Sequence, residues 1–266
     1  MQKVNYSEYT LTAINAAISA GNYLRQGFRT QMEISNKEGR HNLVTEYDTN
    51  SEKNIISFIK ELYPDHDFIA EESGVLDKNQ SDVKWIIDPL DGTVNFAHGI
   101  PFFAVSIAVE CNKEVVAGVV FQPMTYELFV AESKKGAFFN GKKINVSENK
   151  NIGEAFLATG FPYNVAENPD HCIEKFMDVL KIGSPIRRLG AAALDLSYVA
   201  VGRFDAFFEI SLAPWDCAAA KLIVEESGGK VTSWDSTPFD VHSYKPILAS
   251  NGHLHCDLTR ILSREI

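Results

Sequence analysis

The sequence contains few cysteines and no motif that would pair them. Its four cysteines, Cys111, Cys172, Cys217 and Cys256, lie far apart, and no two of them form a C-x-x-C pair. This spacing excludes a compact disulfide framework and a zinc knuckle. It favours reduced thiols, as in a cytoplasmic protein.

Long apolar runs are missing as well. No uninterrupted apolar segment reaches the roughly 18 residues that a membrane-spanning helix needs. The chain starts MQKVNYSEYT, without a basic stretch followed by an apolar run, so it lacks the pattern of a secretory signal. We therefore expect no export, no membrane span and a cytoplasmic location.

Positive charge is scarce. The chain has 25 Lys and Arg against 35 Asp and Glu, which gives a formal net charge of -10. Binding to nucleic-acid phosphates needs clustered Lys and Arg, so nucleic acid is not an expected partner. The excess carboxylates could serve solubility alone, or some of them could hold cations.

Apolar material is plentiful. Of 266 residues, 45% are hydrophobic and 11% are aromatic, which is enough for a large core that needs no disulfide or metal to hold it together. Low-complexity segments and linkers are absent from the sequence. We expect one catalytic domain over residues 1–266 with two lobes, about 1–150 and 151–266, and a functional cleft between them.

Hydrophobic periodicity predicts helices in the first part of the chain. A 3.6-residue apolar period indicates a helix over 7–28 and a second helix near Asp48. Asp48 or Thr49 is placed to cap the start of the second helix, and Pro64 is placed to end it.

From residue 84 to residue 129 the pattern changes to short runs rich in Val, Ile and Phe, which predict an antiparallel meander. After about residue 150, strand-like and helix-like pieces alternate, so an α/β fold with two sheets and packed helices is expected. The later strands are expected at 156–160, 187–189, 205–210 and 246–250, and the helices from Pro169, over 191–201, from Pro214 and at the C-terminus.

Three motifs have better structural than functional interpretations. Residues 136–143 fit G-x-x-x-x-G-K, but Lys143 stands where a nucleotide-binding loop needs Ser or Thr, and Asn140-Gly141 is a better hairpin turn of type I′. The E-E-S-G at 225–228 is typical of a helix end. The nearest candidate for zinc, the H-L-H-C run at 253–256, lacks a fourth ligand at motif distance.

The most informative segment is W-I-I-D-P-L-D-G-T, in which a buried strand ends in two carboxylates, Asp88 and Asp91. Pro89 cannot donate to a sheet and Gly92 permits a tight reversal, so both acids can turn to one side. Free amides near Thr93 suit a phosphate group. The competing interpretation is a turn whose acids cap a helix.

Two further acids share this placement. Glu71 follows the apolar segment Phe68-Ile69-Ala70, and Asp216 stands just inside a helix, as either a cap or a metal ligand. Together with Asp88 and Asp91 they could coordinate two or more cations. Carboxylate oxygens prefer Mg²⁺, which supports phosphoryl transfer.

These residues resemble the inositol monophosphatase family, within the larger group of lithium-sensitive, magnesium-dependent sugar and nucleotide phosphatases. The specific motifs are W-I-I-D-P-L-D-G-T-V-N-F at 85–96 and P-W-D-C-A-A-A at 214–220. L-V-T-E-Y-D at 43–48 and F-I-A-E-E-S at 68–73 match in the expected order. The resemblance covers nearly the whole chain and implies a layered α-β-α-β-α sandwich, as in the inositol monophosphatases and fructose bisphosphatases, commonly as a homodimer.

The resemblance also implies a set of metal ligands for two or three Mg²⁺ ions. The ligands are Glu71, Asp88, the Leu90 carbonyl, Asp91 and Asp216. The substrate implied is myo-inositol monophosphate or another small polyol phosphate.

Roles in binding and catalysis follow from the same likeness. The amides of Gly92 and Thr93 are implied to bind phosphate. Glu71, and Thr93 oriented by Asp48, are implied to activate the attacking water, with no phosphoenzyme. The positions that contact the polyol are Gly190, Ala192 and Glu209, and Lys37 falls in a loop near the metals.

Three alternatives stay open at this point. Relatives that act on 3′,5′-bisphosphonucleotides usually carry a Lys-Glu pair where this chain has Val94-Asn95, the arrangement typical of inositol phosphatases. Fructose-1,6-bisphosphatase activity is compatible with the same motifs. A catalytically idle regulatory homologue is opposed by the intact acidic set. Arg187 and Arg188 could meet a dimer partner, support the substrate loop or be solvated, and we assign them no role.

Overall fold

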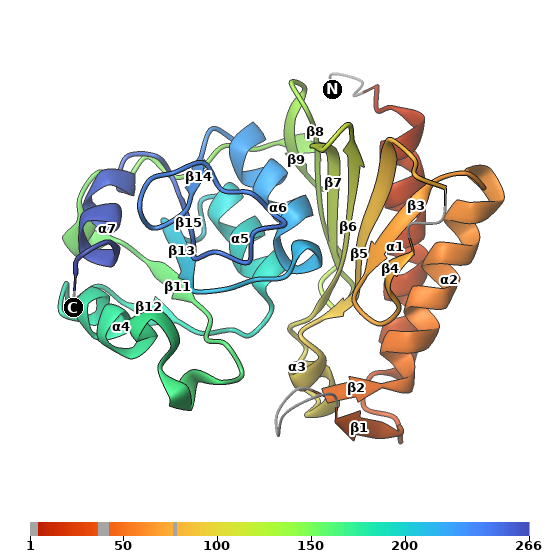
Figure 1. The fold of residues 1–266 in the computed structure, drawn as a ribbon, viewed down its shortest axis with the longest axis horizontal. Helices are drawn as coiled ribbons and strands as arrows, with labels where there is room; N and C mark the ends of the chain where they lie inside the picture. The colour runs from red at the N-terminus through yellow and green to blue at the C-terminus, as the bar shows by residue number, and fades with distance from the viewer. Residues whose placement is uncertain (1–4, 37–42, 77–78, 266) are drawn as a thin grey trace.

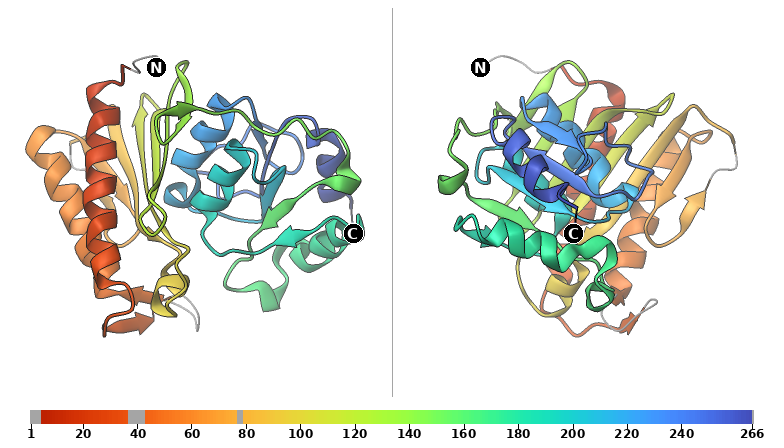
Figure 2. Two further views of the ribbon diagram at one scale, coloured as in Figure 1. Left: turned by 180° about the vertical axis from the view of Figure 1, so that it is seen from behind. Right: turned by 60° about the vertical axis from the view of Figure 1, so that its left-hand side comes forward.

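The computed structural model describes residues 5–36, 43–76 and 79–265. It has five layers, helix, sheet, helix, sheet and helix (Figure 1), and the views in Figure 2 show the same order. The α/β class and the layered sandwich are confirmed. The predicted single domain with two lobes stays a prediction.

The first layer consists of two long helices that cover the outer face of the larger sheet (Figure 1). The helix predicted over 7–28 is confirmed as α1 (Glu8–Gly27), with the Ser7 side chain accepting the Thr10 amide at 3.3 Å. The second, α2, spans Glu46–Leu62 and ends before Pro64 as predicted.

The start of α2 corrects one expectation, because neither Asp48 nor Thr49 is its N-cap. Thr45 is the N-cap and its hydroxyl accepts the Tyr47 amide at 3.1 Å. Asp48, in the first turn, accepts the Thr45 amide in return at 2.8 Å. This reciprocal capping box starts the helix earlier and fixes the carboxylate of Asp48 in place.

The larger sheet has eight strands in the order β10-β9-β8-β7-β6-β5-β3-β4. The predicted meander is confirmed in β5 to β8, which pair antiparallel in sequence, whereas β3 pairs parallel to β5. The strands are β3 (Asp67–Ala70), β4 (Gly74–Leu76), β5 (Val83–Asp91), β6 (Ala104–Cys111), β7 (Glu114–Gln122), β8 (Glu127–Glu132), β9 (Gly136–Phe139) and β10 (Lys142–Lys143).

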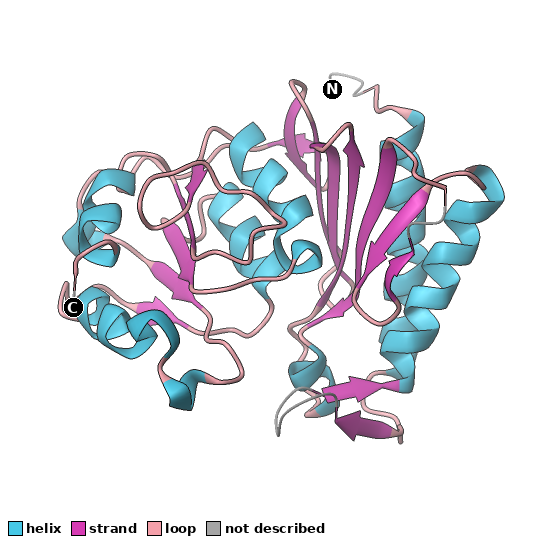
Figure 3. Cartoon of the chain, in the orientation of Figure 1, coloured by secondary structure: helices cyan, strands magenta, loops and turns pink. Residues whose placement is uncertain are grey.

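Helices α5 (Ala192–Ala200) and α6 (Pro214–Glu226) fill the space between the two sheets (Figure 3). The second sheet, in the order β12-β11-β13-β15-β14, carries α4 (Cys172–Leu180) and α7 (His255–Leu262) on its far side. Its strands are β11 (Leu157–Thr159), β12 (Ile186–Arg187), β13 (Ala206–Glu209), β14 (Lys230–Thr232) and β15 (Ile247–Ser250).

The remaining elements are short. Strands β1 (Ile34–Asn36) and β2 (Leu43–Thr45) pair with each other, and α3 (Thr93–Ala97) follows β5. The described residues also contain three 3₁₀ turns, at Ile152–Glu154, Val165–Glu167 and Pro169–His171.

The larger sheet is buried on both faces, which explains the nearly continuous apolar runs in its sequence. On β5, Trp85 and Ile87 belong to the core under α1 and α2, whereas Ile86 belongs to the core under α5 and α6. All three are at most 1% exposed. A strand this deeply buried is a rigid support for the acids at its end.

The middle layer packs against the sheet at a glycine, which gives a first prediction. A Cβ on Gly118 of β7 would lie 2.5 Å from the carbonyl oxygen of Ala219 in α6. We expect Gly118→Ala to lower the free energy of unfolding by about 1–3 kcal/mol, because backbone cannot move aside as a side chain can. Urea unfolding measures it, with Gly153→Ala as the control, since a Cβ there meets nothing nearer than 3.4 Å.

Membrane-spanning helices are absent from the residue ranges given above. None of the helices there combines the length and the apolar character that crossing a bilayer requires.

Candidate active site

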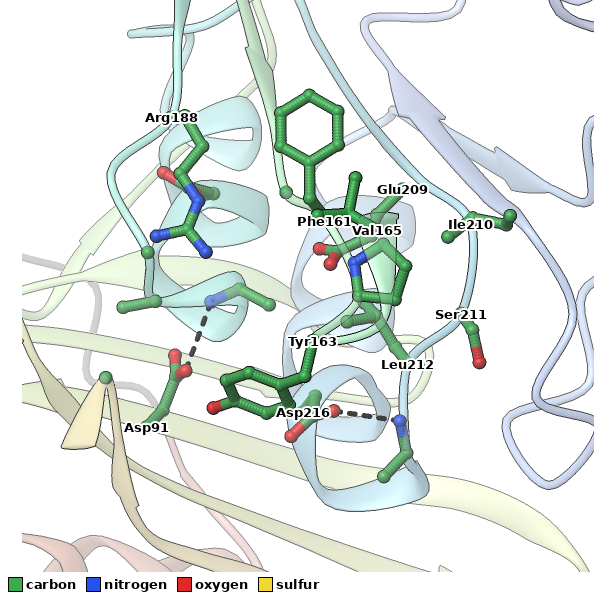
Figure 4. Close-up of a pocket in the computed structure, with 18 of the residues that line it drawn as sticks. Asp91, Phe161, Tyr163, Val165, Arg188, Glu209, Ile210, Ser211, Leu212 and Asp216 are labelled. Atoms are coloured by element: carbon green, nitrogen blue, oxygen red, sulfur yellow. Dashed lines mark hydrogen bonds between the residues drawn. The ribbon is translucent and has the colours of Figure 1, made fainter. Parts of the chain in front are cut away.

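A cavity of about 1080 Å³ lies between segments of the two halves of the chain (Figure 4). Ten of the predicted site residues line it together: Glu71, Asp88, Leu90, Asp91, Gly92, Thr93, Gly190, Ala192, Glu209 and Asp216. Asp48 lies fully buried behind them. Lys37 lies outside the described residues.

Strand topology brings the first acids together. Because β3 and β5 run parallel, their carboxyl ends meet at the same edge of the sheet, with Glu71 after one and Asp88 near the end of the other. The pairing of β5 with β6 shifts register between Asp88 and Asp91. This irregularity at Pro89 and Leu90 re-aims the side chains, as bulges do beside functional sites.

Three of the acids bond to backbone amides. Asp88 accepts the Leu90 amide at 2.9 Å. Asp91 accepts the amides of Ala192 and Ala193 at 3.1 and 2.8 Å and so caps the start of α5 from the opposite half of the chain. Asp216 accepts the Ala213 amide at 2.8 Å at the start of α6 (Figure 4). The capping interpretation therefore holds for Asp91 and Asp216, although it does not account for the four acids facing one cavity.

Burial and mutual repulsion change the acidity of this group. Burial, and then the charges of Glu71, Asp91 and Asp216, raise the pKa of Asp88 well above its usual range. Burial raises the pKa of Asp91 to about 7, although its amide bonds act in the opposite direction. Burial and mutual repulsion disfavour the charged form of these carboxylates, so binding of protons or cations to them is favoured.

The donor set fits Mg²⁺ by its chemistry. It offers carboxylate oxygens and the Leu90 carbonyl, which are hard ligands. As the side chains stand, no three His, Cys, Asp or Glu residues within 5–36, 43–76 and 79–265 are arranged to hold a metal ion. Three of the acids point an oxygen at an amide instead, and a carboxylate oxygen that accepts one amide keeps a second lone pair.

Asp48 orients a hydroxyl in the cavity wall. The Thr93 hydroxyl donates to the Asp48 carboxylate at 2.8 Å and also lies 3.1 Å from the Leu90 carbonyl. The other oxygen of Asp48 is occupied by Thr45, through its amide and its hydroxyl. Both carboxylate oxygens of Asp48 are therefore hydrogen-bonded. Asp48, in the first turn of α2, thus holds the Thr93 hydroxyl in position.

The turn after Asp91 forms part of the cavity wall through Gly92 and Thr93. Gly92 has φ +93, and a Cβ there would lie 3.0 Å from the Phe102 carbonyl, so this turn needs glycine. The helix α3 starts at Thr93, as expected, and its first amides lack intrahelical partners. The side-chain amide of Asn95 (Nδ2) donates to the Phe102 and Leu189 carbonyls at 2.8 Å each, and so holds the turn against the loop that carries Gly190.

The opposite wall contains Gly190, Ala192 and Glu209. Glu209 ends β13 and packs so tightly against Gly160 that a Cβ there would lie 2.1 Å from its carboxylate. Burial, and then the charge of Asp216, raise the pKa of Glu209 to about 8. Arg188 and Arg187 lie in different surroundings. Arg188 lines the cavity, whereas the Arg187 guanidinium stacks over Phe156, 4.9 Å from the ring centroid.

Two cavity residues were missed from the sequence. Tyr163 points its ring toward the acids (Figure 4). Burial, and then the charge of Glu71, raise the pKa of its hydroxyl to about 12, even though 58% of the side chain is exposed; we attribute this to the hydroxyl end, which lies among the acids. Asp195 of α5 lines the same cavity. An acid inside a predicted helix of apolar residues is the signal that could have found it.

The structural interpretations of the two glycine-containing motifs, at 136–143 and 225–228, are confirmed. Asn140 and Gly141 have φ 46 and 74 between β9 and β10, as a type I′ turn requires. Gly228 follows the end of α6 with φ 90. The buried His255 bonds to Thr232 and Ser250, each at 2.8 Å, so its ring is committed to the core.

Known proteins resemble this chain over almost its whole length. A family model described as "Inositol monophosphatase family" matches residues 5–266. The chain is 42% identical to the inositol-1-monophosphatase of Caulobacter vibrioides over 91% of this chain and 96% of that protein. It is also 42% identical to the Nus factor SuhB of Escherichia coli K12 over 84% of each chain.

Solved structures of similar proteins superimpose on this chain. The extragenic suppressor protein suhB from Bartonella henselae superimposes with a TM-score of 0.92 at 38% identity, over 98% of this chain and 100% of that one. An IMPase/NADP phosphatase complexed with Mg²⁺ and phosphate superimposes with a TM-score of 0.81 at 25% identity, over 93% and 92% of the two chains.

Proposed function

The chain belongs to the inositol monophosphatase family, and on that premise we propose that it is a Mg²⁺-dependent phosphomonoesterase that hydrolyses myo-inositol monophosphate or a similar small polyol phosphate. The observation that carries the proposal is one cavity in which Glu71, Asp88, Asp91 and Asp216 adjoin the Gly92-Thr93 turn. Carboxylates for cations and amides for a phosphate thus meet at one place.

The proposed metal ligands are the four acids and the Leu90 carbonyl, which would hold two or three ions. Bound Mg²⁺ supplies charge that stabilises the phosphoryl oxygens and acidifies water. Cations at this place would also offset the repulsion among the acids, which adds to burial in raising the pKa of Asp88.

The chain's own residues would then orient and deprotonate the attacking water. Thr93, held by Asp48 at 2.8 Å, positions the water, and the Glu71 carboxylate takes its proton. The water oxygen attacks phosphorus as the ester bond to the polyol breaks. The polyol oxygen leaves with the bonding electron pair and takes up a proton from solvent water, and the amides of Gly92 and Thr93 bind the phosphate. No phosphoenzyme forms on this route.

Metal dependence gives the direct test of the proposal. Phosphate release from myo-inositol 1-phosphate is expected to require Mg²⁺ and to stop in chelator, because the acids alone repel the phosphate. Li⁺, titrated in the same assay, is expected to inhibit. Full turnover in chelator would remove the metal from the proposal, whereas insensitivity to Li⁺ would contradict only the predicted lithium sensitivity.

Substrate choice within the family gives a separate prediction at Glu209. A carboxyl group on the wall facing the acids (Figure 4) can form hydrogen bonds with ring hydroxyls, and removing one partner of a buried hydrogen bond costs about 1–3 kcal/mol. We expect Glu209→Ala to lower kcat/KM for myo-inositol 1-phosphate by about 5- to 150-fold. The loss on p-nitrophenyl phosphate, which has no ring hydroxyls, is expected to be much smaller. Equal losses would assign Glu209 to the metal site or the fold.

The alternatives differ in their substrates. Asn95, which braces the loop before Gly190, stands where the nucleotidase-like relatives have a charged pair, and this favours the polyol substrate over 3′,5′-bisphosphonucleotides. The phosphate-release assay should therefore use a panel of substrates that also includes fructose 1,6-bisphosphate. The cytoplasmic location and the homodimer stay predictions.

A regulatory role is the second candidate, because relatives 42% identical to this chain are named Nus factor SuhB. Such a role and catalysis are compatible. A chain without phosphatase activity on any substrate of the panel, at saturating Mg²⁺, would favour the catalytically idle regulatory homologue.

A further inference from the structure

Asp195 is a buried acid in the cavity that the proposed mechanism does not use. It lies in the early part of α5 (Ala192–Ala200) and lines the cavity. The side chain is 1% exposed, and within the described part of the chain its Oδ1 atom has no hydrogen-bond partner.

An orphaned oxygen of this kind calls for an explanation. A buried polar atom without a partner costs about 1–3 kcal/mol, so each such atom needs a specific explanation. Of the four such atoms among the described residues, Oδ1 of Asp195 alone belongs to a residue that lines the cavity. Nothing in the packing of α5 requires an acid here, since Leu194 and Leu196 on either side belong to the apolar core. The cavity is the place from which a partner for Asp195 can come.

The charges around Asp195 indicate what kind of partner fits. Burial, and then the charges of Asp91 and Glu209, raise the pKa of Asp195 well above its usual range, while Arg188 opposes the rise. Of the described residues that line the cavity, Arg188 alone carries a positive charge, and its charge acts on Glu209 as well. Two buried acids and one guanidinium thus share this wall.

We propose that Asp195, together with Glu209 and Arg188, forms a subsite for the hydroxyl groups of the polyol, in which Asp195 is a specificity-determining residue. The subsite rests on the proposed function and extends it. Hydroxyls both donate and accept hydrogen bonds, so they match a wall that offers carboxyl oxygens, carboxyl protons and guanidinium N–H groups. A second phosphate would meet only one guanidinium here, beside two carboxyl groups. The wall therefore matches hydroxyl groups better than it matches a second phosphate.

Asp195→Ala and Asp195→Asn test the subsite through the ratio of kcat/KM for myo-inositol 1-phosphate to kcat/KM for p-nitrophenyl phosphate. For Asp195→Ala we expect this ratio to fall about tenfold, as the loss of one hydrogen bond predicts. Asp195→Asn keeps the shape and offers both a donor and an acceptor, so it should recover most of the ratio. Ser197→Ala is the matched control, because Ser197 is buried on the same helix but bonds to the Ala193 carbonyl, away from the cavity, and it should leave the ratio unchanged.

Two results would overturn the subsite. An unchanged ratio in Asp195→Ala would mean that Oδ1 of Asp195 forms a hydrogen bond with water and not with the substrate. Equal losses on both substrates would mean that Asp195 only positions α5 and, through it, Asp91. If the wild-type protein hydrolyses neither substrate, the proposed function fails, and calorimetric binding of myo-inositol 1-phosphate with Mg²⁺ then decides on the subsite alone. Weaker binding by Asp195→Ala than by the wild-type protein would support the subsite there, and equal or undetectable binding by both would overturn it.

Discussion

Replacing Asp88 by asparagine is expected to abolish turnover and, at the same time, to stabilise the metal-free protein. Asp88 is 2% exposed and faces Glu71, Asp91 and Asp216. The charge stabilisation by bound metal is worth several kcal/mol, and each 1.36 kcal/mol is tenfold in rate, so kcat should fall by at least about 10²-fold. Metal binding should weaken as well, because a neutral amide leaves the cations' charge uncompensated. Phosphate release and calorimetric titration with Mg²⁺ measure the two losses.

The stability gain follows from the direction of the pKa shift. An acid whose pKa is raised on folding weakens the folded state at pH values above its unfolded pKa, about 3.9 for Asp, and has no such effect well below it. Asp88→Asn should therefore raise Tm in chelator at neutral pH, and the gain should vanish near pH 3. A gain that persists unchanged at acid pH would contradict the charge explanation.

Two further variants separate the metal site from an ordinary Asp turn. Asp91→Asn is expected to stop turnover too, but with a smaller gain in Tm. The Ala192 and Ala193 amides donate to different oxygens of Asp91, and the NH₂ group of asparagine, which replaces one of these oxygens, cannot accept a hydrogen bond. Asp235→Asn is the control, since the exposed Asp235 accepts the Thr237 amide at 3.0 Å in a surface turn. It should keep the wild-type kcat. Near wild-type turnover and metal affinity in Asp88→Asn would make Asp88 a turn residue as well.

The parts of the fold that were predictable from sequence depend on local physics. The period of α1, the Asn140-Gly141 turn and the glycine at the end of α6 each follow from a few adjacent residues. Strand β14 was missed because Lys230–Thr232 is short and pairs with β15, a partner 17 residues further on. The parallel partner of β5 is likewise non-local. The cap of α2 was misplaced because Thr45, Asp48 and Thr49 are all chemically able to cap a helix.

For the candidate site too, local sequence predicted some residues and not others. Glu71, Asp88 and Asp91 stand at strand ends, where an apolar run stops at a carboxylate and the sequence marks the place. Asp195 carries no such mark, because α5 has apolar core on nearly every side and its periodicity does not single out a polar face. Arg188 and Tyr163 lie in irregular segments. Their direction is set by how the two halves of the chain meet, which no local pattern encodes.

Glu71→Gln is expected to lower kcat by about 10²- to 10⁴-fold with little change in KM, the size typical of a general base. Glu71 follows β3 and lines the same cavity as Thr93, and we propose that its carboxylate takes the proton of a water that Thr93 orients. A base acts mainly in the transition state, and its loss therefore appears in kcat. The measurement needs saturating Mg²⁺, because Glu71 is also a proposed metal ligand.

Calorimetric titration of Glu71→Gln with Mg²⁺ separates these two roles. If metal affinity falls but kcat recovers at high Mg²⁺, Glu71 is a ligand and a different group removes the proton. If kcat stays low when the metal sites are filled, loss of the base explains the defect. The neighbouring Glu72→Gln is the matched control, because Glu72 is not among the residues that line the cavity and its amide donates to Glu52 of α2, so kcat should stay at the wild-type value. An effect confined to KM would reassign Glu71 to substrate binding, and Thr93 with Asp48 would then remain as the group that positions the water.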